Sequence, residues 1–192
     1  MDKIGIVFGG SRGIGKAVAQ LMAQKGYRLA IASRNLEAAR AAAGDLEGNH
    51  LGLCCDVSKE QDVQNAFEEV EKNLGRVKFL VNAAGISRDA LLLRTKTEDM
   101  VSQLNTNLLG SMLTCKAALK HMIQQQGGSI VNIGFIYTDM TKDMKEEQLK
   151  KNIPLGRFGE PKDVAHAVVF LLETPYITGH VLVVDGGLQL AL

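Results

Sequence analysis

The first residues that could do chemistry form a glycine-rich segment near the start of the chain. It reads GGSRGIGKA and places Gly9, Gly13 and Gly15 directly after an apolar run, with Ser11 and Ile14 between them. Gly9 permits a tight turn, Gly13 lets the backbone approach a phosphate, and Gly15 lets the next helix pack closely on the sheet. The N–H groups that begin that helix would face the phosphate. Standing between a predicted strand and a predicted helix, the segment predicts a pyrophosphate-binding loop rather than a glycine turn without a ligand.

Two arginines indicate which dinucleotide the loop would bind. An NAD site usually has Asp or Glu at the end of its second strand, where the carboxylate holds the ribose 2′-hydroxyl. Here that end reads ASRN, which places Arg34 and Asn35 there, while Arg12 lies in the glycine segment. Two guanidinium groups can flank a ribose 2′-phosphate with bidentate contacts. We therefore predict NADP(H); the alternative is that both arginines are merely solvated, and tighter binding of NADH would refute the assignment.

Two further strand ends carry candidate cofactor contacts. CDV places Asp56 and Val57 after the apolar run 51–55, where a carboxylate can meet the adenine amino group. NAAG follows the run 78–82 with small residues, against which a cofactor can lie: Asn82, Ala83, Ala84 and Gly85. Ligands of open α/β sheets bind beyond the carboxyl ends of the strands, so the position of these short segments gives them their weight.

The elements that must position these residues are short apolar runs without polar alternation. Such runs are typical of strands buried on both faces, and they fall at 4–8, 29–33, 51–55, 78–82, 129–133 and 181–184. Apolar residues at helical spacing lie between them: Ile14, Val18 and Leu21; Val63, Phe67, Val70 and Leu74; Met100, Leu104, Leu108 and Met112; Val164, Val168 and Leu171. The order predicts an α/β fold, a doubly wound parallel sheet in three layers. No linker-like stretch divides it, so we expect one domain over 1–192.

Composition and charge exclude several other classes of protein. The 192 residues are 46% hydrophobic and 22% charged, as in a globular domain. The net charge of +1 predicts no nucleic-acid or membrane surface, and no apolar run is long enough to cross a bilayer. Three cysteines, two of them adjacent, and four histidines without ligand spacing argue against a disulfide framework or a metal site. The start MDKIGIVFGG leads straight into a strand pattern, so we expect no cleavable presequence.

Taken together, the motifs resemble the short-chain dehydrogenase/reductase family. GGSRGIG, CDV, NAAG and NTNLLG occur in the family's order, followed by PLGRFGEPKDVAHAVVFLL and ITGHVLVVDGG. The resemblance covers almost the whole chain and lies nearest to NADPH-dependent reductases of the 3-oxoacyl-[acyl-carrier-protein] and carbonyl (quinone) type. It implies a Rossmann-type fold with sheet order 3-2-1-4-5-6-7 and a 3-oxoacyl thioester or quinone substrate. It also implies a tetramer, and a place in fatty acid biosynthesis in the mitochondrial matrix.

The resemblance further implies a set of catalytic residues. In the family a Tyr donates the proton, a Lys four residues later lowers its pKa, a Ser after the fifth strand orients the substrate, and an Asn positions a relay water. Asn107 in NTNLLG matches that Asn, although its amide could instead serve only the helix backbone. Thr138 matches a Thr that contacts the nicotinamide carboxamide, and it could equally cap the following helix.

The catalytic segment of that family is absent from this sequence. SIVNIG runs directly into FIYTDM, with Phe135 where the Ser is expected, and no Tyr-x-x-x-Lys pair occurs anywhere. Tyr137 and Lys142 are five residues apart, so the pair lacks the helical spacing and we reject Tyr137 as proton donor. The gap corresponds to one helix–strand unit, about 30 residues or more. Segment 181–184 must then pair directly with the fifth strand or leave a sheet edge exposed, and we expect the pairing because it preserves hydrogen bonding.

Three functional interpretations follow from this absence. The chain could be a shortened form of an NADPH-dependent reductase, which we expect to be inactive or severely impaired. It could be a catalytically silent NADP-binding subunit, in a homo- or hetero-tetramer with a related reductase, although losing a helix of the tetramer face puts assembly in doubt. It could also be a non-functional splice product. Melting with and without NADPH separates the last two, because a ligand that binds only the folded state raises the melting temperature.

Overall fold

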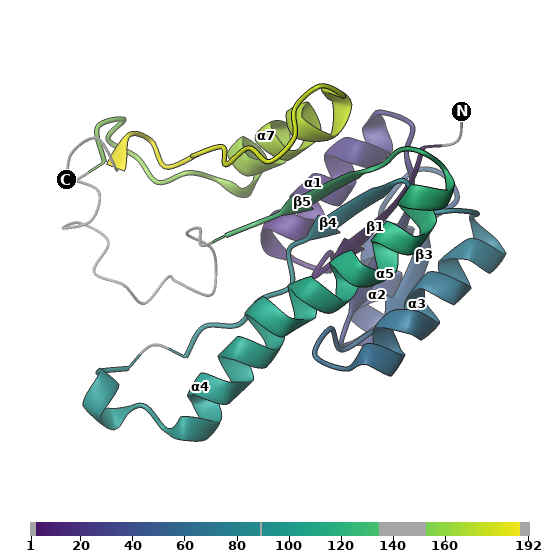
Figure 1. Ribbon diagram of the computed structural model, residues 1–192. Helices are drawn as coiled ribbons and strands as arrows, with labels where there is room; N and C mark the ends of the chain where they lie inside the picture. Colours follow the sequence, from purple (N-terminus) through teal and green to yellow (C-terminus); the bar gives the residue numbers. More distant parts are fainter. Residues whose placement is uncertain (1–2, 89, 135–152, 189–192) are drawn as a thin grey trace.

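Five parallel strands form the sheet of this protein, in the order β3-β2-β1-β4-β5 (Figure 1). A computed structural model describes residues 3–88, 90–134 and 153–188. The strands are β1 (Ile4–Phe8), β2 (Arg28–Ser33), β3 (Leu51–Cys54), β4 (Phe79–Asn82) and β5 (Ser129–Asn132). The first five predicted strands are thus confirmed, and each predicted end lies within one residue of the observed end. The chain starts in the middle of the sheet and winds outward in both directions, as predicted.

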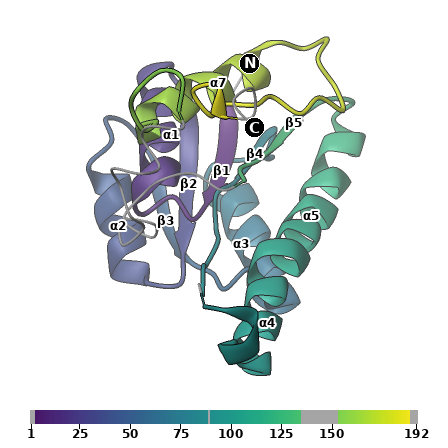
Figure 2. The same ribbon diagram turned by 90° about the vertical axis from the view of Figure 1, so that its left-hand side faces the viewer.

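Helices cover both faces of the sheet (Figure 2). One face carries α1 (Gly13–Gln24), α2 (Leu36–Gly44) and α7 (Pro161–Glu173), and the other carries α3 (Glu60–Asn73) and α5 (Gly110–Gln124). Alternate strand residues supply the two cores: Val7 packs with the first group of helices, whereas Ile6 and Phe8 pack with the second. The predicted three layers are therefore present.

The strand registers bring the carboxyl ends to one edge. Phe8 of β1 lies opposite Ala32 of β2 and Asn82 of β4. Asn82 in turn lies opposite Asn132 of β5. Every connection that leaves this edge therefore starts close to its neighbours, and these connections include the glycine segment and NAAG.

A long helical arm leads into the last strand of the sheet. After the short helix η1 (Leu92–Arg94) come α4 (Thr97–Gln103), the π-helical turn η2 (Leu104–Leu109) and α5, without a break from Thr97. The arm extends beyond the sheet at its α4 end (Figure 1). The sequence pattern correctly predicted one long helix. Its apolar stripe, however, is not packed: Leu104 is 58% exposed, Leu108 57% and Met112 59%.

The strand predicted at 181–184 is wrong. These four residues lie outside the sheet without regular structure, and their side chains are 38–83% exposed. No described residue pairs with the free edge of β5, so the expected pairing of 181–184 with the fifth strand is wrong, and the structure shows the alternative, an exposed edge. The physical reason is that β-propensity becomes a strand only where a neighbouring strand supplies the hydrogen-bond ladder. The helical stretch expected near 142–151 lies outside the described residues.

Two classes of feature are not found in the described ranges. None of the helices there is long and apolar enough to span a bilayer. The same residues contain no group of three His, Cys, Asp or Glu side chains that could hold a metal ion.

Candidate functional site

A cavity of about 1120 Å³ lies along the carboxyl edge of the sheet. Its volume is slightly above the roughly 300–1,000 Å³ of common ligand pockets, so it has room for a dinucleotide. Most of the predicted site residues line it: Gly9, Ser11, Arg12, Gly13, Ile14, Gly15, Arg34, Asn35, Asp56, Val57, Ala83, Ala84, Gly85 and Asn107. The registers of four strands bring these residues together from segments up to about a hundred residues apart in the chain.

Two glycines of the first loop are required by close backbone approach. Gly9 has φ +77°, and a Cβ there would lie 2.6 Å from backbone atoms of Ala83 and Ala84. The Gly9 N–H donates to Ala32 O at 2.8 Å, which fixes the turn to β2. A Cβ on Gly15 would collide with the carbonyl of Gly9. The roles that the sequence assigned to Gly9 and Gly15, a tight turn and close packing, therefore match the geometry.

Helix α1 begins at this loop without a side-chain cap. Its N-cap residue Arg12 makes no capping hydrogen bond, and the first turn contains no acidic residue. Helix α2, by contrast, is capped by Asn35, whose Oδ1 accepts from Ala38 N at 3.0 Å. The first N–H groups of α1 therefore lie at the cavity wall without a side-chain acceptor among the described residues, which is the arrangement that binds anions.

Two guanidinium groups stand at the same wall. Arg12 and Arg34 are both exposed, and neither guanidinium has a hydrogen-bond or ion-pair partner within the described part of the chain. Most other arginines described here are committed; Arg157, for example, donates to Asp163 Oδ2 at 2.7 Å. Uncommitted cations beside an uncapped helix create a concentrated positive potential, suited to phosphate.

Asp56 lies beside these arginines at the end of β3. Its Oδ1 accepts from the backbone N–H of Ser58 at 3.1 Å and from its hydroxyl at 2.7 Å, whereas Oδ2 has no partner among the described residues. Partial burial opposes ionisation, but the Ser58 hydrogen bonds and the nearby Lys59 and Arg34 outweigh it, so the pKa of Asp56 is lowered. Asp56 is thus a carboxylate with one oxygen free to accept a hydrogen bond.

Asn107 lies in the π-helical turn η2 and binds the loop that follows β4. Its Oδ1 accepts from Ile86 N and its Nδ2 donates to Ile86 O, both at 2.8 Å. The amide therefore serves a neighbouring loop, and not the backbone of its own helix as the alternative proposed. This pair of bonds holds the segment 83–87 against the cavity, and π-turns recur at functional sites.

One predicted residue, Asn82, is not at the cavity wall. Asn82 is only 5% exposed and is absent from the lining. Its Nδ2 donates to Asn132 Oδ1 at 2.8 Å and its Oδ1 accepts from the Thr114 hydroxyl at 2.9 Å, so it joins β4, β5 and α5. Thr138 lies outside the described residues.

The sequence assigned no role to the loop before α7, yet this loop forms part of the cavity wall from Arg157 to Pro161. Arg157 donates to the Asp163 carboxylate at 2.7 and 3.3 Å and to the Phe158 carbonyl at 3.0 Å. Glu160 and Asp163 form a reciprocal capping box, with Pro161 at the first helical position. The sequence carries that helix-start signal, but only the packing of α7 beside α1 places the loop at the cavity.

The described lining contains few groups that could transfer a proton. No Tyr, Lys or His is among its residues. Cys55 lines the cavity, but burial, with the charges of Asp62 and Asp56, raises the pKa of its thiol to about 12. The remaining acids are Asp56 and Glu160.

Comparison with known families decides the class of the chain. A family profile described as short chain dehydrogenase matches residues 3–147, more than half of the sequence. The chain belongs to the short-chain dehydrogenase family. A second profile, described as Enoyl-(Acyl carrier protein) reductase, matches residues 133–189.

Individual relatives cover the chain from end to end. The 3-oxoacyl-[acyl-carrier-protein] reductase of Homo sapiens is 65% identical, over all of both chains. Carbonyl reductase family member 4 of Xenopus laevis is 55% identical, again over the full length of each. The 3-oxoacyl-[acyl-carrier-protein] reductase FabG of Aquifex aeolicus (strain VF5) is 33% identical over 97% of both chains. This short-chain dehydrogenase is therefore similar to reductases throughout its described length.

The lengths of these alignments are informative. The comparison with the human reductase extends over 237 positions, 45 more than the 192 residues of this chain.

Proposed function

We propose that this short-chain dehydrogenase binds NADP(H) in the cavity along the carboxyl edge of its sheet, as one domain spanning 1–192. The observation that carries the proposal is the wall formed by the uncapped start of α1 together with the uncommitted side chains of Arg12 and Arg34. A pyrophosphate at the helix start and a ribose 2′-phosphate between the guanidinium groups would satisfy all three features. Asp56 Oδ2 is free to accept from the adenine amino group.

Asn35 and the small residues of NAAG complete the proposed contacts. Asn35 follows Arg34 at the cavity and caps α2. This cap holds the end of β2 at the cavity. Ala83, Ala84 and Gly85 present backbone with little side-chain bulk, kept in place by the bonds between Asn107 and Ile86. The remaining proposed cofactor contacts come from Gly9, Ser11, Gly13, Ile14, Gly15, Val57 and Thr138.

We also propose that the ancestral reaction is the NADPH-dependent reduction of a 3-oxoacyl thioester or a quinone, and that this chain has lost it wholly or largely. In that reaction the nicotinamide would provide the hydride, and a protein group would have to deliver a proton to the carbonyl oxygen. No Tyr, Lys or His among the described lining residues can deliver it. The 45 additional alignment positions in the human relative support an internal segment missing from this chain. A positioned general acid contributes about 10²–10⁴ in rate.

The direct test is a calorimetric titration with NADPH and NADH, paired with an activity assay. We expect NADPH to bind at least about tenfold more tightly than NADH, because the 2′-phosphate adds charge-assisted hydrogen bonds. With acetoacetyl thioesters or quinones we expect no turnover, whereas the 65%-identical human reductase serves as the positive control. Tighter NADH binding would refute the cofactor, and turnover at the rate of the human enzyme would refute the loss of activity.

Location and assembly are proposed on the resemblance alone. Relatives named as 3-oxoacyl-[acyl-carrier-protein] reductases support a place in fatty acid biosynthesis, and we propose the mitochondrial matrix. The proposed assembly is a homo- or hetero-tetramer with a related reductase. The second candidate function is that of a catalytically silent NADP-binding subunit in such an assembly. The exposed apolar stripe of α4, η2 and α5 favours a chain that pairs with a partner. Light scattering of the purified chain, alone and mixed with the human reductase, would test both assemblies.

A further inference from the structure

A loop along one side of the cavity is held by side chains of the helical arm. Residues 83–88, which we call the cavity loop, follow β4 and have no regular secondary structure. Five of these residues line the cavity: Ala83, Ala84, Gly85, Ile86 and Ser87. The Ala83 N–H donates to Phe8 O at 2.9 Å, so the sheet fixes the start of the cavity loop. The rest of its path must be fixed by contacts outside the sheet.

Two amide side chains of the arm bind the backbone of the cavity loop, about one helical turn apart. Asn107 accepts from Ile86 N and donates to Ile86 O, both at 2.8 Å. Gln103 accepts from Arg88 N with its Oε1 at 3.1 Å. Residues four positions apart lie on one face of a helix and about 6 Å apart along its axis. Two residues of chain span at most about 7 Å. The spacing of the two amides therefore matches that of Ile86 and Arg88.

Asp99 lies on the same face of the arm, one further turn toward its start. Its carboxylate lies 3.8 Å from Nε of Arg88, but both side chains are exposed to water, so this ion pair contributes little. The bond from Arg88 N to Gln103 differs because it is made by the backbone, and it therefore fixes the path of the chain itself. Of these two contacts to Arg88, the one with Gln103 determines where the cavity loop runs.

Ser87 lies between the two residues whose backbone the arm binds, and it lines the cavity. On the other side of Ile86, a Cβ on Gly85 would lie 3.4 Å from Asn107 Oδ1, so the cavity loop runs close to the arm there as well. Loss of the Gln103 bond would release the backbone at Arg88 and, with it, Ser87 at the cavity wall. A ligand that contacts this segment would then have to order it, and the lost conformational entropy would weaken binding.

We propose that Gln103 is a positioning residue of the cavity, which together with Asn107 holds the cavity loop in the path that a dinucleotide meets. The inference rests on the proposed NADP(H) function and adds a residue to it. Gln103 is not among the residues that line the cavity, so it acts through the backbone of Arg88 and the adjoining Ser87. A single Gln on an exposed helix carries no local sequence signal for this role, because its partner lies 15 residues earlier in the chain.

Three variants of the full chain test this inference, with two measurements on each. Q103L removes the acceptor with little change in size, whereas Q103E keeps a side-chain oxygen that can accept from Arg88 N. The control Q124L makes the same change at the exposed Gln124, the last residue of α5. Leu, Gln and Glu have similar helix propensities, so the arm itself is preserved. Hydrogen exchange of the Arg88 amide is measured in the ligand-free chain, and NADPH affinity by calorimetry.

We expect Q103L to speed exchange of the Arg88 amide by about twofold to tenfold and to weaken NADPH binding by a similar factor, because one hydrogen bond is lost. Q103E should bring both quantities back to within about twofold of wild type, and Q124L should change neither. Rescue by Q103E separates a positioning role from a general loss of stability, since only the acceptor oxygen is restored.

The outcomes separate this inference from the function on which it rests. If wild type binds NADPH and Q103L binds it as tightly, Gln103 does not position the site and the inference falls, while NADP(H) binding stands. Equal weakening of binding by Q124L, or failure of Q103E to restore binding, overturns the inference in the same way. If wild type itself binds no NADPH, the proposed function fails and the positioning role falls with it.

Discussion

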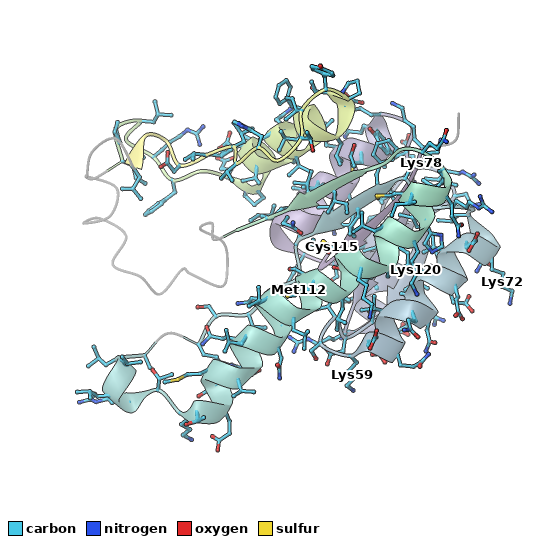
Figure 3. The ribbon with its side chains drawn as sticks, in the orientation of Figure 1. Lys59, Lys72, Lys78, Met112, Cys115 and Lys120 are labelled. Atoms are coloured by element: carbon cyan, nitrogen blue, oxygen red, sulfur yellow. The ribbon has the colours of Figure 1, made fainter. Side chains whose placement is uncertain are left out.

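Residues 3–82 and residues 90–188 differ in how completely their apolar side chains are covered. Every exposed large hydrophobic residue in the described structure lies at Leu91 or beyond, and none lies in 3–82. Helices α3 and α5 show the contrast on one face of the sheet. Val63, Phe67 and Val70 of α3 are buried, whereas α5 exposes Ile123 by 72%. Figure 3 shows Met112, Cys115 and Lys120 along the length of α5.

The difference teaches where the fold is complete. The described residues of the part built on β1, β2 and β3 leave no large apolar side chain exposed, which is the pattern of a completed core. The part beyond β4 has exposed apolar helix faces and an apolar segment at 181–184 that is 38–83% exposed, and no described strand pairs with the outer edge of β5. Large exposed apolar patches mark surfaces that normally meet a partner. This supports the proposal that a segment of the chain that would pack there is absent.

The largest effect that sharpens this comparison is truncation of matched side chains on α3 and α5. Phe67 is 3% exposed and packs in the second core, beside Phe8 at a centroid distance of 6.0 Å. We expect F67A to lower the free energy of unfolding by about 3–5 kcal/mol, and I123A to change it by less than about 0.5 kcal/mol. Denaturant unfolding measures both. An equal cost for the two variants would show that Ile123 is covered in solution, and would break the comparison.

The second effect tests the glycine turn at the centre of the complete part. Gly9 and Gly26 have nearly the same positive φ, +77° and +80°, but a Cβ on Gly26 would meet no atom within 4 Å. G26A should lose only the conformational term, about 1–2 kcal/mol. G9A adds a backbone collision, so it should lose more stability and also lose NADPH binding. Equal unfolding free energies for the two variants would refute the close approach of Gly9 to NAAG.

The third effect concerns the hydrogen bond that connects α5 to β4, where the two parts meet. Thr114 is fully buried on α5, and its hydroxyl donates to Asn82 Oδ1, which leaves that oxygen unpaired in T114V. A buried unpaired acceptor costs about 1–3 kcal/mol. The control T174V removes an exposed hydroxyl that donates to Phe170 O, and it should cost near zero. If thermal and denaturant unfolding find T114V as mild as T174V, β4 and α5 are not joined through Asn82.

The smallest effect lies in the ion pair at the start of α7. The Arg157 guanidinium and the Glu160 N–H lower the pKa of Asp163 to about 2. Because the folded-state pKa lies below the unfolded value near 4, the contribution is present above about pH 4 and is lost as the pH falls toward 2. The pair is largely exposed, so D163N should cost at most about 1 kcal/mol near pH 6.

Unfolding of D163N and R157Q at pH 6 and pH 3 measures this contribution. The two single variants remove the same interaction, so the double variant should lose little more than either alone. A difference between wild type and D163N that grows on acidification would contradict the direction of the pKa shift.

Much of the fold could be predicted because the relevant signals are local. Apolar runs without polar alternation, such as 4–8, correctly predicted five strands. Gly9 and Gly15 occupy positions where the close approach of backbone atoms excludes a Cβ. The prediction at 181–184 was wrong because a valine-rich run forms a strand only beside a partner. Asn82 was predicted to touch a cofactor, yet its hydrogen bonds run to Asn132 and Thr114, 50 and 32 residues away in the chain.

The sequence alone determined the order of strands and helices, the glycine loop that follows β1, the two arginines near it and the absence of a Tyr-x-x-x-Lys pair. Each of these depends on residue types within a few positions of one another. Only the tertiary structure decided which polar side chains lack a hydrogen-bond partner and which apolar helix faces remain exposed among the described residues. Asn107 is committed because Ile86, 21 residues earlier, comes within 2.8 Å of its amide. The physical reason is that a hydrogen-bond partner or a covering side chain is supplied by folding, from parts of the chain that no local pattern connects.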